Sequence, residues 1–277
     1  MVDGVPVLIH EANSLFTVAD FAAGRATTFQ PPSRLRRLLG RAVPSLSKNH
    51  RAAANYARLA KMLKAEAPQP RVLVLGGSIL GQGMEVLADD PAITLAETDV
   101  AWGPRTALIA DAHDIPFADG TFDGVIAQAV LEHVVDPARC VAEMCRVLRP
   151  GGLVYAETPF MQQVHMGRYD FARYTPLGHR RLFRQFEEIA SGASSGPGMA
   201  LAWAWQYWLT SWARRKAFRA LLAAAAGWTA WPLKYLDRWL LERPGAYDAA
   251  SATYFLGRKS ERTLSDRELI GLYRGAL

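Results

Sequence analysis

The feature that most constrains this chain is a buried strand that runs directly into a glycine-rich turn. The apolar run at residues 72–75 is typical of a strand covered on both faces of a parallel sheet. The turn that follows contains Gly76, Gly77, Ser78, Gly81 and Gly83. Glycine permits positive φ and leaves no Cβ between the backbone and a ligand. A turn of this kind is where α/β sheets hold nucleoside cofactors.

Acidic residues follow the next two predicted strands. Glu97 and Asp99 end the run 93–99, about twenty residues after the glycine turn, where a carboxylate can accept ribose hydroxyls. They lie two positions apart and share a face of the strand, so either can do this. Asp111 follows the third predicted strand, where its carboxylate and the Ala112 amide can meet an adenine. Residues 100–106 are too few for a crossover helix, so we expect a loop there and an open adenine edge.

Two further strands flank a predicted helix. Residues 124–130 form an apolar run, and Asp136-Pro137 then supplies a helix N-cap and a first-turn proline. Apolar residues at 141, 144, 147 and 148 give this helix one buried face. Residues 153–158 are the fifth predicted strand. The alternation of strands and helices predicts a parallel α/β sheet.

Three motifs together resemble the class I S-adenosylmethionine-dependent methyltransferases, in their small-molecule branch. They are Asp-Ala-His-Asp-Ile-Pro-Phe-Ala-Asp-Gly-Thr-Phe-Asp at 111–123, Ala-Val-Leu-Glu-His-Val at 129–134 and Arg-Val-Leu-Arg-Pro-Gly-Gly at 146–152. The resemblance implies S-adenosylmethionine as cofactor. It places the methionine part on the glycine turn, the ribose on Glu97 or Asp99 and the adenine on Asp111. The cofactor-binding residues implied are Gly76, Gly77, Ser78, Gly81, Gly83, Glu97, Asp99, Asp111, Ala112, Gln128 and Ala129.

The resemblance also implies the fold class. We expect an α/β, Rossmann-like, doubly wound, seven-stranded sheet with the last strand antiparallel, plus a helical insertion before that strand. Residues 187–192 and 252–257 are the last two predicted strands. The expected division is an N-terminal segment and cap helix at 1–66, a cofactor-binding core at 67–197, a tryptophan-rich helical insertion at 198–245, and the final strand and tail at 246–277.

Methyl transfer is an in-line displacement for which the protein supplies alignment and exclusion of water. A hydroxyl acceptor also benefits from a base near its proton. His133 and His165 follow the fourth and fifth predicted strands, and His165 is the better base candidate. The expected acceptor-pocket residues are Tyr169, Asp170, Arg173, Tyr174 and Glu157. We expect O-methylation of a small-molecule or lipid-like acceptor.

A non-catalytic binding or scaffold protein on the same fold is the alternative. Its support is Val74, which stands where the family often has an acid, two residues before the first glycine, together with a glycine turn longer than the compact G-x-G-x-G form. Such a protein would bind the cofactor weakly or not at all.

The insertion before the last strand holds seven of the eight tryptophans in the chain. Its uncharged runs, 199–213 and 220–233, are shorter than the roughly 18–20 residues that a membrane-spanning helix requires. Three interpretations stay open: helices that cap the active site, helices at 199–241 that lie on a membrane surface, or a homodimer interface.

Charge, cysteine content and the N-terminal sequence limit which partners and which cellular compartment we expect. The net charge is +6, with basic clusters at Arg34, Arg36, Arg37, Arg41, Lys48 and Arg51 and at Arg214, Arg215, Lys216 and Arg219. No nucleic-acid-binding module accompanies them, so we do not expect a nucleic-acid partner. Cys140 and Cys145 have a spacing that suits neither a disulfide nor a zinc site, and we expect no metal ion. Residues 1–10 lack a signal-peptide pattern, so we expect a cytoplasmic protein, with peripheral association with the inner face of a membrane left open.

Overall fold

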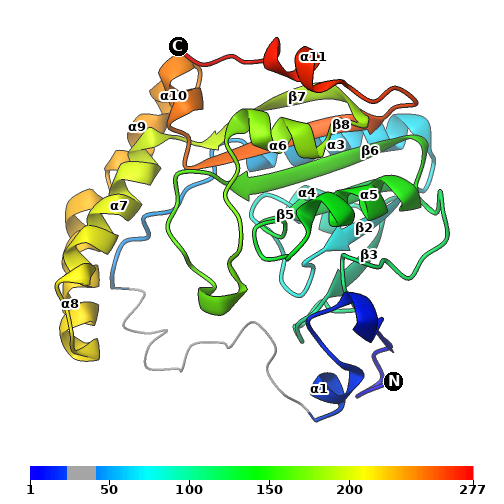
Figure 1. Ribbon diagram of the computed structural model, residues 1–277, viewed down its shortest axis with the longest axis horizontal. Helices are drawn as coiled ribbons and strands as arrows, with labels where there is room; N and C mark the ends of the chain where they lie inside the picture. Colours follow the sequence, from blue (N-terminus) through cyan, green and yellow to red (C-terminus); the bar gives the residue numbers. More distant parts are fainter. Residues whose placement is uncertain (24–41, 277) are drawn as a thin grey trace.

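The computed structural model describes residues 1–23 and 42–276, with a central sheet that has helices on both faces (Figure 1). Within these residues the sheet has eight strands in the order β1-β4-β3-β2-β5-β6-β8-β7. The strands are β1 Val7–Leu8, β2 Arg71–Leu75, β3 Thr94–Asp99, β4 Leu108–Ala110, β5 Phe122–Gln128, β6 Leu148–Pro159, β7 Phe186–Ser195 and β8 Ala252–Lys259. The basic residues Arg34, Arg36, Arg37 and Arg41 lie outside the described residues.

The helices connect these strands or flank them. They are η1 Glu11–Asn13, α1 Val18–Ala22, α3 Ala52–Glu66, α4 Glu85–Ala88, α5 Pro137–Val147, η2 Gly167–Tyr169, α6 Pro176–Leu182, α7 Pro197–Ser211, α8 Lys216–Ala230, α9 Leu233–Leu240, α10 Pro244–Asp248 and α11 Asp266–Ile270.

The central strand β2 explains why both faces of the sheet are covered. It pairs in parallel with β3 on one side and β5 on the other. Because side chains alternate along a strand, Leu73 and Leu75 pack into the layer that contains α5, and Val72 and Val74 pack into the layer that contains α3. All four are buried, which accounts for the unbroken apolar run in the sequence.

Helix α5 begins where the sequence predicts. The Asp136 carboxylate accepts a hydrogen bond of 3.0 Å from the Arg139 backbone N–H, and Pro137 occupies the first turn. The apolar face is buried, as predicted, through Val141, Met144 and Val147. Both cysteines are free thiols, one buried in this face and one partly buried.

The prediction that the last strand is antiparallel is confirmed, whereas the predicted number of strands was one too few. β8 runs antiparallel to both of its neighbours, β6 and β7. The additional strand, β1, pairs in parallel with β4 through Val7 and Leu8. A strand of two residues has no alternation of apolar and polar positions, so it leaves no periodic signal in a sequence.

The N-terminal segment closes the sheet edge that the sequence led us to expect to be open. Residues 100–106 form no helix, as expected. Phe16 and Phe21 nevertheless pack against Ile109 of β4, and the Phe21 ring lies 6.4 Å from the Trp102 ring. The expectation was wrong because the apolar cover comes from a distant part of the chain.

Helices α7 to α10 form a group beside the carboxyl end of β6 (Figure 1). The N-terminus of α7 is held by Asp237 of α9, a fully buried carboxylate. It accepts backbone hydrogen bonds from Gly196, Gly198 and Met199 at 3.1, 2.7 and 3.0 Å. Among the described residues, no helix combines the length and apolar character needed to cross a membrane.

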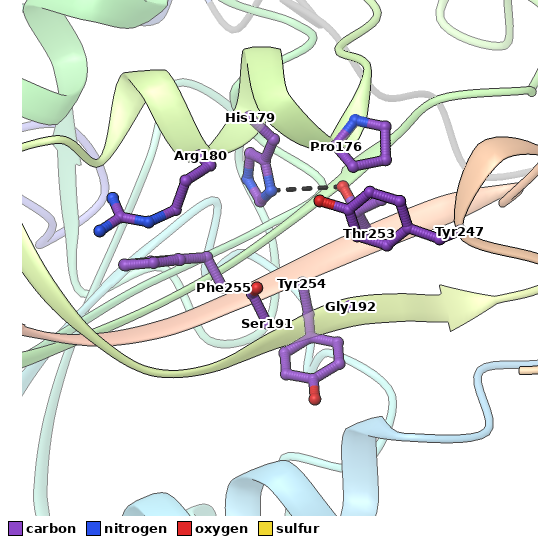
Figure 2. A pocket seen from close by; sticks show the side chains of 9 residues that line it. All are labelled: Pro176, His179, Arg180, Ser191, Gly192, Tyr247, Thr253, Tyr254 and Phe255. Carbon is purple, nitrogen blue, oxygen red and sulfur yellow. Dashed lines mark hydrogen bonds between the residues drawn. The ribbon is translucent and has the colours of Figure 1, made fainter. Parts of the chain in front are cut away.

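A small pocket lies between α6, β7 and β8 (Figure 2). Its volume is about 10 Å³, at the lower limit for a single water, so it is not a substrate site. His179 is fully buried there, with Nδ1 3.2 Å from the Thr253 hydroxyl and, among the described residues, no partner for Nε2. Burial, followed by the charge of Arg180, lowers the pKa of His179 to about 3.

Replacing Asp237 by alanine should lower the free energy of unfolding by about 3 kcal/mol, because three buried N–H groups lose a charged acceptor. Chemical denaturation measures this change. Asp266→Ala is the control, since Asp266 pairs with Arg181 on the exposed surface and its loss should leave the midpoint nearly unchanged. Equal effects of the two substitutions would contradict the capping role.

Acidification should destabilise the protein through His179. The folded state keeps this imidazole neutral down to about pH 3, whereas the unfolded chain protonates it below about pH 6.5. Between these values the unfolded state binds more protons, so stability falls as the pH falls. From pH 7 to pH 5 the contribution is about 2 kcal/mol. His179→Gln should show a loss of stability over this range that is smaller by that amount, and identical pH profiles would contradict the assignment.

Candidate functional site

A cavity of about 550 Å³ opens at the carboxyl ends of the parallel strands. It lies where open α/β sheets bind ligands, and its volume is in the range of small-molecule sites. The wall is mainly apolar, with a few carboxyl, amide and imidazole groups. Of the predicted site residues, it contains Gly76, Ser78, Gly81, Asp99, Asp111, Ala112, Gln128, Ala129, His133, Glu157 and His165.

The glycine turn bends the chain directly after β2. Gly76 has φ +68°, and a Cβ there would lie 2.6 Å from a Val130 methyl group, so this position requires glycine. Ser78 and Gly81 line the cavity, whereas Gly77 and Gly83 do not. A Cβ on Gly83 would lie 2.7 Å from the Ala53 backbone nitrogen, so Gly83 serves the contact between the turn and α3.

The structure separates the two acids of β3. Asp99 lies at the cavity wall, and its Oδ2 accepts a 3.0 Å hydrogen bond from the Ser78 backbone N–H. Burial raises the pKa of Asp99, against the hydrogen bonds from Ser78. Glu97 is not at the wall; it bonds Arg105 Nε at 2.5 Å. Of the two acids, Asp99 is therefore the one that reaches the cavity.

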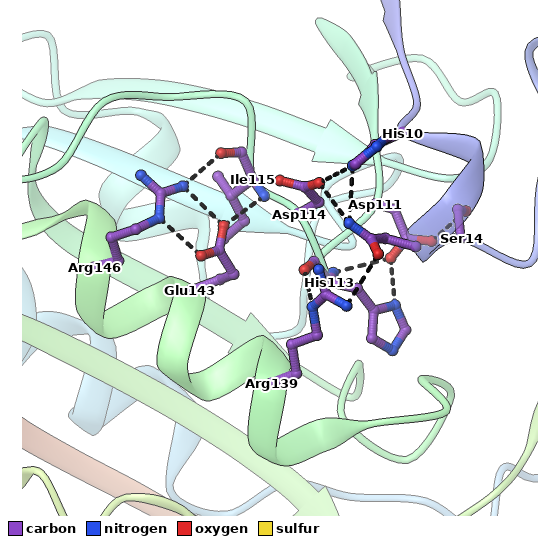
Figure 3. A network of polar contacts seen from close by, with 10 residues as sticks. His10, Ser14, Asp111, His113, Asp114, Ile115, Arg139, Glu143 and Arg146 are labelled. Atoms are coloured by element: carbon purple, nitrogen blue, oxygen red, sulfur yellow. Dashed lines mark hydrogen bonds and ion pairs between the residues drawn. The ribbon is translucent and has the colours of Figure 1, made fainter.

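Asp111 directly follows β4, the neighbour of β3 on the side away from β2. It lies in a polar network shown in Figure 3. Its Oδ1 accepts hydrogen bonds from the His113 backbone N–H at 3.0 Å and ring Nδ1 at 2.6 Å, and Oδ2 accepts one from the Ser14 hydroxyl. Burial acts to raise the pKa of Asp111, but these hydrogen bonds lower it overall. A carboxylate at the wall beside the Ala112 backbone is thereby kept ionised and oriented.

The ends of β5 and β6 form the next part of the wall. Glu157 accepts hydrogen bonds from Asn49 Nδ2 at 2.6 Å, from Gln128 Nε2 at 3.2 Å and from the Tyr155 hydroxyl. Burial raises the pKa of Glu157. Gln128 Oε1 is buried without a hydrogen-bond partner among the described residues. Ala129 has φ +55°, a conformation that is uncommon for residues other than glycine and is often found at functional sites.

His133 and His165 come together on the far side of β2 from Asp99 and Asp111. Their rings lie edge to face, with centroids 4.8 Å apart. His133 Nδ1 lies 2.7 Å from the Tyr169 carbonyl oxygen. Burial lowers the pKa of both imidazoles, so both are neutral at physiological pH.

Tyr169, Asp170, Arg173 and Tyr174 are not at the cavity wall. Asp170 is buried and bonded by the Arg173 guanidinium, and it accepts a 2.9 Å hydrogen bond from the His165 backbone N–H. Burial opposes ionisation of Asp170, but these interactions lower its pKa to about 2. Asp170 and Arg173 therefore fix the loop that presents His165.

Several wall residues were missed by sequence reasoning. They are Leu15 and Phe16 before α1, Ser47, Lys48 and Asn49 before α3, Ser195 at the end of β7 and Met199 of α7. No motif marks these positions, because their place at the cavity depends on tertiary packing. His113 is different, because it lies within the first family-like motif, and that motif could have identified it as a wall residue.

A family model described as a methyltransferase domain matches residues 79–156. This match and the methyltransferase relatives support a class I S-adenosylmethionine-dependent methyltransferase, the family that the chain resembles. It is 42% identical over 91 residues to an uncharacterized methyltransferase of Mycobacterium tuberculosis, covering 30% of this chain and 37% of that protein. It is 36% identical over 151 residues to a demethylmenaquinone methyltransferase of Clavibacter sepedonicus, covering 52% and 60%.

A solved structure also resembles this methyltransferase. Phosphoethanolamine N-methyltransferase 2 of Haemonchus contortus, in complex with S-adenosyl-L-methionine, matches 75% of this chain and 53% of its own, at 15% identity and a TM-score of 0.45. The chain spans less than two thirds of the length of each of these three relatives.

The cavity fits S-adenosylmethionine, the cofactor of this family. Asp99 and Asp111 offer carboxylates, and Gln128 offers an unpaired buried acceptor. Gly76 and Gly81 have no side chain, so their backbone is accessible to a ligand at the wall. A buried acceptor without a partner is costly unless a ligand supplies the donor.

Asp99 and Glu97 provide a matched test of the ribose contact. Asp99→Ala should weaken binding of S-adenosylhomocysteine by at least about tenfold, the effect of losing a charged hydrogen bond. Glu97→Ala should change it less than about threefold, because Glu97 does not reach the cavity. Isothermal titration calorimetry measures both, after melting curves show that both variants fold. A larger loss in the Glu97 variant would reverse the assignment.

Proposed function

We propose that this protein transfers a methyl group from S-adenosylmethionine to an oxygen of a small-molecule or lipid-like acceptor. The observation that carries the proposal is a single cavity wall that joins two sets of groups. Asp99, Asp111 and the glycine turn form the cofactor side, and His133 and His165 form the other side.

The residues of this wall would have distinct tasks. S-adenosylmethionine, when bound, supplies an electrophilic methyl group on a sulfonium. The apolar wall excludes water, and Glu157 and Gln128 fix the floor at the ends of β5 and β6. His165 is the group that we propose assists loss of the acceptor's hydroxyl proton, because it is neutral and faces the cavity.

The cavity and one relative support the proposed class of acceptor. The mainly apolar wall favours an aromatic or isoprenoid compound over a charged one. The relative from Clavibacter sepedonicus is named for demethylmenaquinone, a quinone. A quinol carries hydroxyl groups on an apolar ring, so it is the first acceptor to test. Methylation at carbon is the second candidate, and the position of a transferred labelled methyl group in the product distinguishes the two.

His165→Ala should lower kcat for methyl transfer to a quinol by about 10²–10⁴-fold, the range for loss of proton-transfer assistance. Binding of S-adenosylhomocysteine should stay unchanged, because His165 lies away from Asp99 and Asp111. Transfer of a tritiated methyl group measures the rate, and calorimetry measures the affinity. Failure of the wild-type protein to bind the cofactor would reject the enzyme and favour the scaffold alternative.

We also propose that helices α7 to α9 lie on the inner face of a membrane that holds the acceptor. Five exposed tryptophans support this: Trp205, Trp208, Trp212, Trp228 and Trp239. Arg214, Arg215, Lys216 and Arg219 lie exposed between or within α7 and α8. Tryptophan favours the headgroup region, and basic residues favour anionic lipids.

Flotation with vesicles of anionic phospholipid should carry the protein upward, and neutral vesicles should carry less of it. The double variant Trp208→Ser, Trp212→Ser should lose most of this binding while keeping its affinity for the cofactor. If the wild-type protein stays at the bottom of the gradient, the proposed membrane association is wrong. A dimer that dissociates in the double variant would assign these helices to a homodimer interface.

A further inference from the structure

Glu132 is the most unusual buried group in the described part of the chain. Its side chain is 1% exposed, and, apart from an interaction with its own backbone N–H, neither carboxylate oxygen has a hydrogen-bond partner among the described residues. An unpaired buried carboxylate is costly, and such groups in native proteins usually have a ligand or a function. The tasks assigned above to the cavity wall make no use of Glu132.

Glu132 does not stand alone. One ligand atom each from Glu132, His133 and His165 lie within 4.8 Å of one another. His133 Nε2 is 3.7 Å from Glu132 Oε1. His133 and His165 also line the 550 Å³ cavity. We propose that Glu132, His133 and His165 bind a divalent transition-metal cation at the cavity wall.

The orientation of the histidines suits this task. The Nδ1–H of His133 can donate to the Tyr169 carbonyl oxygen, which leaves a lone pair on Nε2, the ring atom near Glu132 Oε1. His165 Nδ1 lies 3.4 Å from Asp170 Oδ2. Metal-binding histidines typically have such a carbonyl or carboxylate beside the other ring nitrogen. Arg173 is the nearby cation, and its charge is matched by Asp170, which it contacts.

The ligand set indicates the class of metal. Two imidazoles and one carboxylate suit zinc and similar first-row ions, and three protein ligands leave a coordination position open to the cavity. Tetrahedral ligand bonds of about 2.0–2.2 Å place two ligand atoms about 3.3–3.6 Å apart. The ligand atoms here lie up to 4.8 Å apart, so side-chain rotation has to draw them together when an ion binds. His165 is 31% exposed and has room for it.

The consequence for substrate choice rests on the proposed function. An acceptor oxygen at the open position would lose its proton more readily, so the site favours acceptors with an oxygen donor. His165 would then assist deprotonation as a metal ligand. If the site binds no metal, the methyltransferase activity stands and His165 acts on the proton directly, so the two proposals fail separately.

The metal-free protein, titrated with Zn²⁺ by calorimetry, should bind one ion with a Kd of about 1 μM or tighter. Glu132→Gln and His165→Ala should each weaken binding by at least a hundredfold. His10→Ala is the matched control, since it removes an exposed histidine of the N-terminal segment, and it should leave the affinity unchanged. Melting curves establish that the variants fold. Because His165 is partly exposed, its variant should fold, and it tests the metal site even if the Glu132 variant does not fold.

Two further readouts locate the ion. Co²⁺ substituted at this site should give a visible spectrum without the thiolate band that Cys140 or Cys145 would produce. Anomalous scattering at the zinc edge should show a peak between the three side chains. Absence of saturable binding, binding that survives both substitutions, or a thiolate spectrum would overturn the proposal.

Discussion

The hydrogen-bonded pairing of β2 with β5 is the constraint on which the site depends. Its register sets Leu75 beside Ala127, so the glycine turn and Gln128 leave adjacent strands at the same level. The backbone can then bend at Gly76 close to Val130 only because no Cβ intervenes. The cavity begins at this bend. A shift of register would separate the cofactor side of the wall from the histidines.

Burial of carboxyl groups around this cavity sets its electrostatic character. Burial raises the pKa values of Asp99 and Glu157, and it raises that of Glu132 to about 8. Buried carboxyl groups are expensive to ionise, so a cationic ligand close to them is favoured. A sulfonium cofactor is such a ligand, and a divalent metal ion is another. The same feature therefore supports both the fit of the cofactor to the cavity and the proposed metal site.

The sequence predicts the parts of the molecule that are local in the chain. Asp136-Pro137 predicts the start of α5, and the apolar run at 72–75 predicts β2, because capping and periodicity act within a few residues. Glu97 and Asp99 share a strand face, yet the cavity begins only at the strand end, so the sequence alone left both open. The choice between them required the position of Arg105, which ties Glu97 away from the wall.

Contacts between segments far apart in the chain could not be predicted from the sequence. Asn49 reaches Glu157 across 108 positions, and Ser14 reaches Asp111 across 97. The polar and aromatic composition of 169–174 suggested an acceptor pocket, but composition does not tell which way a loop faces. The proposed role of Glu132 as a metal ligand likewise depends on where His165, 33 positions away in the chain, lies in space.

A crystal structure of the protein with S-adenosylhomocysteine would show directly how the cavity holds the cofactor. We predict adenine beside Asp111 and Ala112, ribose hydroxyls on Asp99, and the sulfur directed toward the side of the cavity that holds His133 and His165. A structure in which the compound binds elsewhere, or with its sulfur turned away from these histidines, would contradict this prediction.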